Sequence, residues 1–222
     1  IELGFQASMA MVELKLSIRD QSAAPLLAST EELVRSVFRD QIASSGETLE
    51  EAVVELLLDK AKSLCLAEGC SSGQITRMLH GAESADQLLL TSLVFNQRLS
   101  IDRYLAEYAE SDEDEVQRIP LDALNRLLLK KLLKQTGAGM GLVTSPAEPI
   151  VSANTSFPSK RLVVSCGSPD NQISREYVIA RERDDFRTFV SIAALDLLRR
   201  YLRDYPTDNP YYFDEKTRHL LR

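Results

Sequence analysis

The stretch KSLCLAEGCSSGQITRML, residues 62–79, constrains the fold more than any other part of the sequence. A short apolar run is followed by small residues and then by apolar residues at helical spacing, which predicts a buried strand, a tight turn and an amphipathic helix. A strand that leads directly into a helix is a building unit of α/β folds. We therefore expect an α/β domain, and we name its strand-to-helix turn, residues 69–73, the elbow.

The rest of the sequence predicts a small α+β unit at residues 1–45, an α/β domain at 46–205 and a tail at 206–222. In the small unit an alternating strand pattern precedes a helix over 29–43, with Ser29 or Thr30 as its N-cap. Helices are expected at 49–63, 72–82, 100–110, 120–136 and 184–205, and strands at 63–68, 86–95, 139–145, 160–167 and 174–181. Helices alternate with strands early and strands cluster late, which predicts a three-layer sandwich with a mixed sheet. The tail contains several prolines and is expected to wrap the surface or a partner.

Charge and cysteine content narrow the classes of partner. The formal net charge is −7, which argues against nucleic acid and anionic membrane surfaces as partners. No apolar run approaches the roughly 20 residues of a membrane span. Three cysteines without CxxC spacing indicate neither a zinc site nor a disulfide framework, so we expect a reducing cytoplasm and no metal or cofactor. Because the chain enters a strand pattern at once without an initiator methionine, we expect it to be part of a longer protein.

The small residues of the elbow leave two interpretations open. Free backbone N–H groups at the start of the helix would form a seat for an anion or a phosphate. Alternatively, the segment is only a tight turn with Ser71 or Ser72 as N-cap. Cys70 is either a thiolate nucleophile or a small buried residue. A nucleophilic cysteine generally needs a base, and the two histidines, His80 and His219, lie at the far end of the helix and in the tail.

Two further charged segments also have two interpretations each. The acidic run ESDEDE, residues 110–115, lacks the glycine and closing glutamate of a calcium loop, which favours a solvated acidic loop over a cation site. Arg181, Arg183 and Arg187 lie at a strand-to-helix junction where they could bind a phosphate. The other interpretation is an ordinary helix start, with Asp184 and Asp185 complementing the helix dipole.

The segment CLAEGCSSGQITRML resembles the AESCTGG elbow of the CinA (competence/damage-inducible) family, whose C-terminal domain is a nicotinamide-nucleotide amidase, or NMN deamidase. The resemblance extends over residues 1–203. It includes LLTSLVFNQRLSIDRYL, where the family has a strand and a TYSNEAK-like segment, GAGMGLVTSPAEP, where it has VTGIAGP, and RERDDFRTFVSIAALDLLRRYL, which is similar to its GDR segment and last helix. Residues 1–45 resemble the KH-like unit that precedes this domain. Full-length members also carry an N-terminal domain that resembles molybdopterin-binding proteins.

The resemblance implies that the catalytic groups have been lost. In the family, the elbow serine attacks the carboxamide of the nicotinamide, and a tyrosine and a lysine of the TYSNEAK-like segment activate it. These three positions fall on Gly69, Phe95 and Ser100. An unassisted hydroxyl is a poor nucleophile, so a site without its base is expected to be inactive. The alternative is an active amidase with a relocated nucleophile at Cys70 or Ser71.

The expected function is therefore that of a degenerate amidase domain. It would act as a scaffold, an oligomerisation module or a nucleotide-binding module, with a homo-oligomer expected. A retained nucleotide of the NMN type would lie against the elbow residues Cys70, Ser71, Ser72 and Gly73. The resemblance adds two further ligand-binding positions: Thr144, which falls on the threonine of TGIAGP, and Arg183, which falls on the arginine of GDR.

Overall fold

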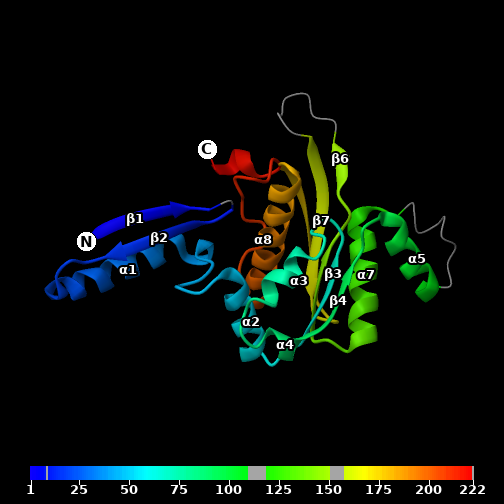
Figure 1. Cartoon of the computed structure of the whole chain (residues 1–222), viewed down its shortest axis with the longest axis horizontal. Helices are drawn as coiled ribbons and strands as arrows, with labels where there is room; N and C mark the ends of the chain where they lie inside the picture. Colours follow the sequence, from blue (N-terminus) through cyan, green and yellow to red (C-terminus); the bar gives the residue numbers. More distant parts are fainter. Residues whose placement is uncertain (9, 110–118, 151–157, 222) are drawn as a thin grey trace.

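The computed structural model describes residues 1–8, 10–109, 119–150 and 158–221. The chain forms a mixed sheet covered by helices on both faces, together with a two-stranded hairpin that projects to one side (Figure 1). The acidic run at 110–115 lies outside the described residues. The predicted α/β fold with a mixed sheet is confirmed.

The main sheet has six strands in the order β4-β3-β5-β7-β6, with β8 on the other edge of β7. Strand β3 pairs in parallel with β4 and β5, whereas β7 pairs antiparallel with β5, β6 and β8. The strands are β3 (Leu64–Glu68), β4 (Leu89–Val94), β5 (Met140–Thr144), β6 (Glu148–Ile150), β7 (Ser159–Gly167) and β8 (Gln172–Ala180). The parallel order places the carboxyl ends of β3 and β5 next to each other, with the elbow directly after β3.

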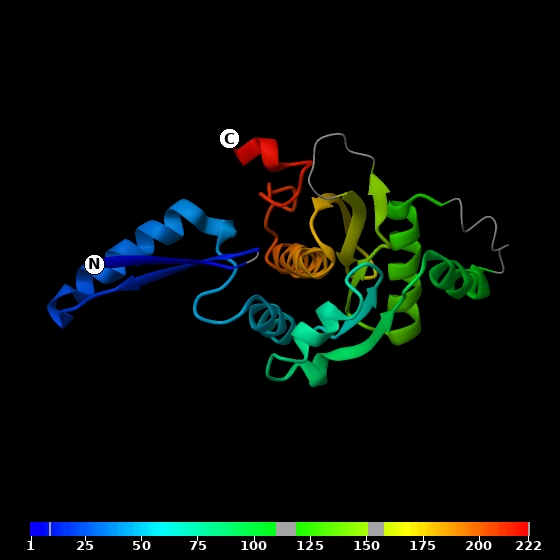
Figure 2. The ribbon, with the colours of Figure 1, turned by 45° about the horizontal axis from the view of Figure 1, so that its top comes forward.

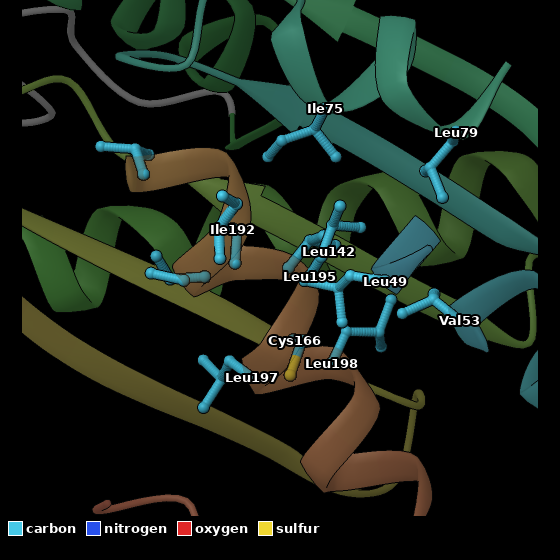
Figure 3. Close-up of a cluster of buried hydrophobic side chains, with 14 of the residues drawn as sticks. Leu49, Val53, Ile75, Leu79, Leu142, Cys166, Ile192, Leu195, Leu197 and Leu198 are labelled. Atoms are coloured by element: carbon cyan, nitrogen blue, oxygen red, sulfur yellow. The ribbon is translucent and has the colours of Figure 1, made fainter. Parts of the chain in front are cut away.

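The helices form two layers that bury two separate cores. The layer with α2 and α8 buries the larger core, part of which is drawn in Figure 3, where Leu49 and Val53 of α2 approach Leu195 and Leu198 of α8. On the opposite face α7 packs with α5 over a smaller cluster that includes Cys65, Leu128 and Val143. The helices are α2 (Leu49–Asp59), α3 (Gln74–Leu79), α4 (Ala85–Leu88), α5 (Arg98–Ala109), α7 (Leu121–Thr136) and α8 (Arg183–Leu202).

Local sequence signals explain several helix ends. The Thr48 hydroxyl accepts a hydrogen bond from the Glu51 N–H, and the Glu51 carboxylate accepts one from the Thr48 N–H, so α2 begins with a capping box. Gly137 ends α7 in the left-handed conformation that glycine adopts without a steric cost.

Two local predictions were wrong. Helix α1 (Ala24–Phe38) begins five residues before the predicted N-cap Ser29, because Pro25 occupies its first turn, and Ser29 and Thr30 instead bond the Leu26 carbonyl within the helix. The segment at 86–95, predicted as a core strand, begins as α4 and continues as β4. In the described sheet β4 pairs only with β3, which leaves Leu90 49% exposed at the edge.

The N-terminal unit comprises β1 (Glu2–Ala7), β2 (Val12–Ser17) and α1. It projects from the α/β part, with α1 lying along the hairpin (Figure 2). Two buried arginines of α8 bind the segment that directly follows α1. Arg199 and Arg200 both donate to the Asp40 carbonyl, at 2.9 and 3.0 Å, and both donate to the Asp196 carboxylate. Sequence reasoning did not identify this network.

The tail packs against β8 and α8. Asp214 bridges to Ile179 of β8, and its carboxylate accepts a hydrogen bond from the Val178 N–H at 2.9 Å. Phe213 is 2% exposed and stacks against Tyr211 at 4.9 Å between ring centroids. Within the part of the chain that is described, no helix combines the length and the apolar character that a membrane crossing needs.

Candidate functional site

The elbow is tied to the end of β5. The Gly69 N–H donates to both oxygens of Thr144, at 3.0 Å to the carbonyl and 3.1 Å to the hydroxyl, and the Cys70 N–H donates to the Ser145 carbonyl at 3.0 Å. The hydroxyls of Ser71 and Thr144 lie 2.8 Å apart, and both residues are fully buried. Two of the predicted ligand-binding residues therefore meet each other in the interior.

The carboxylate of Glu68 occupies the start of α3. It accepts hydrogen bonds from the Ile75 N–H at 3.0 Å and from the Thr76 N–H at 2.8 Å, and a further one from the Thr76 hydroxyl at 2.6 Å. Glu68 is 0% exposed, so this anion is supplied from within the chain. The N–H groups that an external phosphate would use at this helix start already have a partner.

The prediction that Ser71 or Ser72 caps the helix was wrong. The helix begins at Gln74, its N-cap is Gly73, and Gly73 has φ +86° and makes no side-chain cap. Ser72 also lies in the left-handed region at φ +55°. Two consecutive residues with positive φ turn the chain sharply, which a small residue followed by glycine allows. Glu68 then provides the helix start with the acceptor that a capping serine would have provided.

Gly69 has no space for a side chain. A Cβ atom built at this position would lie 2.6 Å from the Ser145 carbonyl carbon and 2.7 Å from both the Ser145 oxygen and the Pro146 nitrogen. These are backbone atoms, and Ser145 is held by its N–H to the Val163 carbonyl at 2.9 Å and by its hydroxyl, which accepts from the Val163 N–H at 2.9 Å. The backbone after β5 thus occupies the place where a nucleophilic side chain would stand.

Cys70 is a neutral thiol at physiological pH. Burial raises its pKa to about 12, and the nearby Glu68 carboxylate also raises it, whereas the positive charge of Lys160 acts in the opposite direction. Lys160 comes from β7, and its Nζ lies 4.6 Å from the centre of the Phe186 ring. Sequence reasoning did not connect Lys160 with the elbow.

The remaining predicted positions lie apart from the hydrogen bonds of the elbow. Phe95 is half-buried, and its ring lies 5.5 Å from that of Tyr104, while its N–H donates to the Glu68 carbonyl at 2.8 Å. Ser100 is exposed on α5 and Arg183 is exposed at the first position of α8. Among the described residues, neither takes part in a hydrogen bond of the elbow.

The arginines around Arg183 do not form one cluster. Arg181 bonds the Ala180 carbonyl and lies over the Phe189 ring, whereas Arg187 pairs with Asp184 at 3.8 Å. Asp184 and Asp185 occupy the first turn of α8. The helix start with its acidic first turn is as predicted, and phosphate binding by these arginines stays a prediction.

Two surface clefts are lined by other residues. One, of about 290 Å³, lies between the start of α7 and strands β6 to β8. The other, of about 510 Å³, lies between residues 35–47 and the end of α8. In the described parts of the chain, no group of three or more histidine, cysteine or acidic side chains is placed to hold a metal ion.

Comparison with known proteins finds relatives that match most of this chain. It is 23% identical over 213 residues to a CinA-like protein of Syntrophotalea carbinolica, a match that covers 91% of this chain and 49% of the relative. A CinA-like protein of Geobacter sulfurreducens is 25% identical over 203 residues, with 86% and 46% covered. The chain is thus related to CinA-like proteins along most of its length. It spans about half the length of these curated relatives, and no family model matches it.

Solved structures with the same fold include a CinA superfamily protein and a competence or damage-inducible protein. The CinA superfamily protein of Klebsiella pneumoniae 700603 aligns with a TM-score of 0.59 at 14% identity, and covers 70% of this chain and 96% of its own. The competence or damage-inducible protein of Enterobacter asburiae aligns with a TM-score of 0.58 at 14% identity, with 71% and 99% covered. At this identity the likeness shows the CinA fold alone.

Proposed function

We propose that this chain carries a CinA-type amidase fold whose elbow no longer deamidates NMN, and that it serves as a non-catalytic interaction module of a longer cytoplasmic protein. The proposal rests on the lack of space at Gly69, where an added Cβ would lie 2.6–2.7 Å from backbone atoms of Ser145 and Pro146. A site that had lost only its hydroxyl would still have room for it. Here the space itself is filled.

The positions that the resemblance assigns to the base also lack a group that would activate a nucleophile. Hydrolysis of an amide by a serine requires a base within hydrogen-bond reach. The ring of Phe95 supplies no proton acceptor, and Ser100 supplies no amine and lies exposed on α5. Ser71 is buried, and its hydroxyl is engaged by Thr144. These contacts support a structural role for the hydroxyl groups at the elbow.

The contacts of Glu68 favour an interaction module over a nucleotide-binding one. An incoming phosphate would have to compete with a buried carboxylate that already accepts three hydrogen bonds at the start of α3. We therefore rank nucleotide binding below an interaction role. A retained NMN-type ligand would lie against Cys70, Ser71, Ser72, Gly73, Thr144 and Arg183. The missing half of the relatives' length is proposed to hold the molybdopterin-binding-like domain that the family resemblance implies.

An active amidase with Cys70 as nucleophile is the second candidate, because Lys160 places a positive charge near this thiol. Such an enzyme would need Lys160 to stabilise the thiolate against the effect of burial. The net pKa of about 12 opposes that role, since little thiolate would form at neutral pH.

Release of ammonia from NMN tests both candidates. The purified chain is incubated with NMN beside a CinA relative that retains the elbow serine as positive control, and no release above buffer is expected. Turnover that disappears in Cys70→Ala, with Ser72→Ala as the matched control, would establish the second candidate and overturn the first.

Thermal shift separates the two non-catalytic roles. A ligand that binds only the folded state must raise the apparent stability. For an interaction module, Tm is expected to stay unchanged at millimolar NMN. A rise with NMN that is absent with nicotinamide riboside, which lacks the phosphate, would show that the module binds nucleotides.

A further inference from the structure

The N-terminal unit exposes an unusual amount of apolar surface. Among its described residues, 1–8 and 10–38, none is buried. Eight large apolar side chains of this unit are 45–67% exposed: Ile1, Leu3, Phe5, Val12, Leu26, Leu33, Val37 and Phe38. An isolated hairpin with one helix buries too little surface for stability in water. We therefore expect another protein surface to pack against the apolar side chains of this unit.

The register of the hairpin places its apolar side chains on one face. Leu3 pairs with Leu16, Phe5 with Leu14 and Ala7 with Val12, and directly opposite residues share a face. The other face is polar, since Glu2, Gln6 and Glu13 point to it. Leu14 and Leu16 of β2 are half-buried, and α1 contacts β2, whereas Leu3 and Phe5 of β1 are 54% and 67% exposed. Helix α1 thus leaves the β1 half of the apolar face open.

One flank of α1 continues this surface. Leu26, Leu33 and Val37 are spaced by seven and four residues, so they form a single stripe along the helix. The stripe lies beside the half-buried Leu27 and Val34. The exposed stripe and the open half of the sheet face belong to the same small unit.

Strand β1 also has a free edge. In the described structure it pairs only with β2, so the backbone N–H and C=O groups of its outer edge are available to another strand. Antiparallel pairing of two β1 strands about Gly4 would place Leu3 opposite Phe5 of the second copy and Glu2 opposite Gln6. Apolar residues would then meet apolar residues on one face, and no like charges would face each other.

We infer that the N-terminal unit is a homodimerisation surface, whose occupant is a second copy of this chain. A two-fold axis at Gly4 produces a four-stranded sheet, β2-β1-β1-β2, with both α1 helices on its apolar face and their stripes in contact. One symmetric interface of this kind covers the free edge, the open half of the sheet face and the helix stripe together. The inference rests on the proposed interaction role and assigns it a partner and a surface.

Area and charge agree with a second copy. Eight side chains, each about half to two-thirds exposed, offer roughly 500–800 Å² per copy, close to the roughly 800 Å² per partner of a stable interface. Charges over residues 1–19 balance, with Glu2 and Glu13 against Lys15 and Arg19, and Arg19 pairs with Glu2. Over the whole unit, residues 1–38, five acidic and three basic side chains give a formal charge of −2, so only a small part of the net charge of −7 lies at this surface.

Sedimentation of the 222-residue chain tests the surface. We expect a dimer for the wild type and a monomer for Phe5→Glu at micromolar concentration. Leu220→Glu alters a side chain of similar exposure, 61%, outside the unit and is expected to remain dimeric. A monomeric wild type, or a Phe5→Glu variant that still dimerises, would overturn the inference.

A cross-link tests the register without depending on the fold of a charged variant. Paired residues at a two-fold axis have Cα atoms roughly 4.5–5.5 Å apart, within the span of a disulfide. Gly4→Cys is expected to form an intermolecular disulfide on mild oxidation, and Gly46→Cys in an exposed loop is expected not to. A dimer in which Gly4→Cys does not cross-link would refute the β1 pairing and point to another occupant of this surface. The outcome is independent of the NMN assay, so either proposal can fail alone.

Discussion

Replacement of Gly69 by serine would return to the elbow the hydroxyl that the CinA resemblance assigns to this position. The structure predicts that the variant is both inactive and destabilised. The added Cβ would lie 2.6 Å from the Ser145 carbonyl carbon, far inside ordinary van der Waals contact. Relief requires movement of the Ser145–Pro146 backbone, because no flexible side chain is in the way.

The cost of that movement follows from the hydrogen bonds of Ser145. Its carbonyl accepts from Cys70, its N–H donates to Val163, and its hydroxyl accepts from Val163, at distances of 2.9–3.0 Å. Overpacking costs about 1–3 kcal/mol, and each weakened hydrogen bond adds about 1 kcal/mol. We expect a loss of about 3 kcal/mol, which in a chain of this size lowers Tm by about 6–12 °C.

Thermal unfolding with two matched glycine variants measures the effect. Gly69→Ala introduces the same clash without the hydroxyl and is expected to match Gly69→Ser. Gly139→Ser adds the same atoms where the nearest neighbour, at 2.9 Å, is Cδ of the flexible Lys62 side chain, and is expected to change Tm by less than about 2 °C. Ammonia release from NMN is measured on the same samples, and none is expected because Phe95 and Ser100 provide no base.

Two results would refute this reasoning. A Gly69→Ser protein as stable as the wild type would show that the Ser145–Pro146 backbone yields easily, so that the site is open. NMN turnover by Gly69→Ser would show that a base other than the assigned positions serves the elbow. Destabilisation of Gly139→Ser to the same degree would show that the Tm change does not report the clash.

The buried arginines and Cys70 give two further predictions. Asp196→Asn removes the carboxylate shared by Arg199 and Arg200, whose side chains are 1–2% exposed, and should lower the free energy of unfolding by about 3–5 kcal/mol in urea unfolding. Asp122→Asn, which breaks an exposed pair, should change it by less than about 1 kcal/mol, and equal effects would contradict the role of burial. Burial raises the pKa of Cys70 from 9.0 to about 12, so the folded state retains a proton that the unfolded chain releases. The contribution of this thiol to the free energy of unfolding is therefore complete below pH 9 and is lost as the pH rises toward 12. Iodoacetamide at pH 8 should therefore label Cys70 slowly in the folded protein and rapidly in urea, and equally fast labelling in both would disprove the shift.

Features of the sequence that act over a few residues could be predicted well. The capping box at Thr48 and the stop at Gly137 depend on neighbouring residues, and both are present. The start of α1 was misplaced because serine and threonine also occur inside helices, where their hydroxyls bond a preceding carbonyl, and Pro25 was the stronger signal. The glutamate of the family motif AESCTGG falls on Glu68. Its position at the end of a strand did not allow us to predict that its carboxylate accepts hydrogen bonds from the first N–H groups of α3.

The sequence by itself determined the α/β class, most of the helices and strands, and the CinA resemblance, from which the proposed loss of catalytic groups at Gly69, Phe95 and Ser100 follows. Only the tertiary structure decided that Gly69 has no room for a side chain, because the obstructing backbone follows Thr144, which is 75 residues away in the chain. The pairing of β3 with β5 brings these segments together. Local patterns record which face of an element is apolar, whereas the space around a residue is set by segments that meet it only once the sheet has formed.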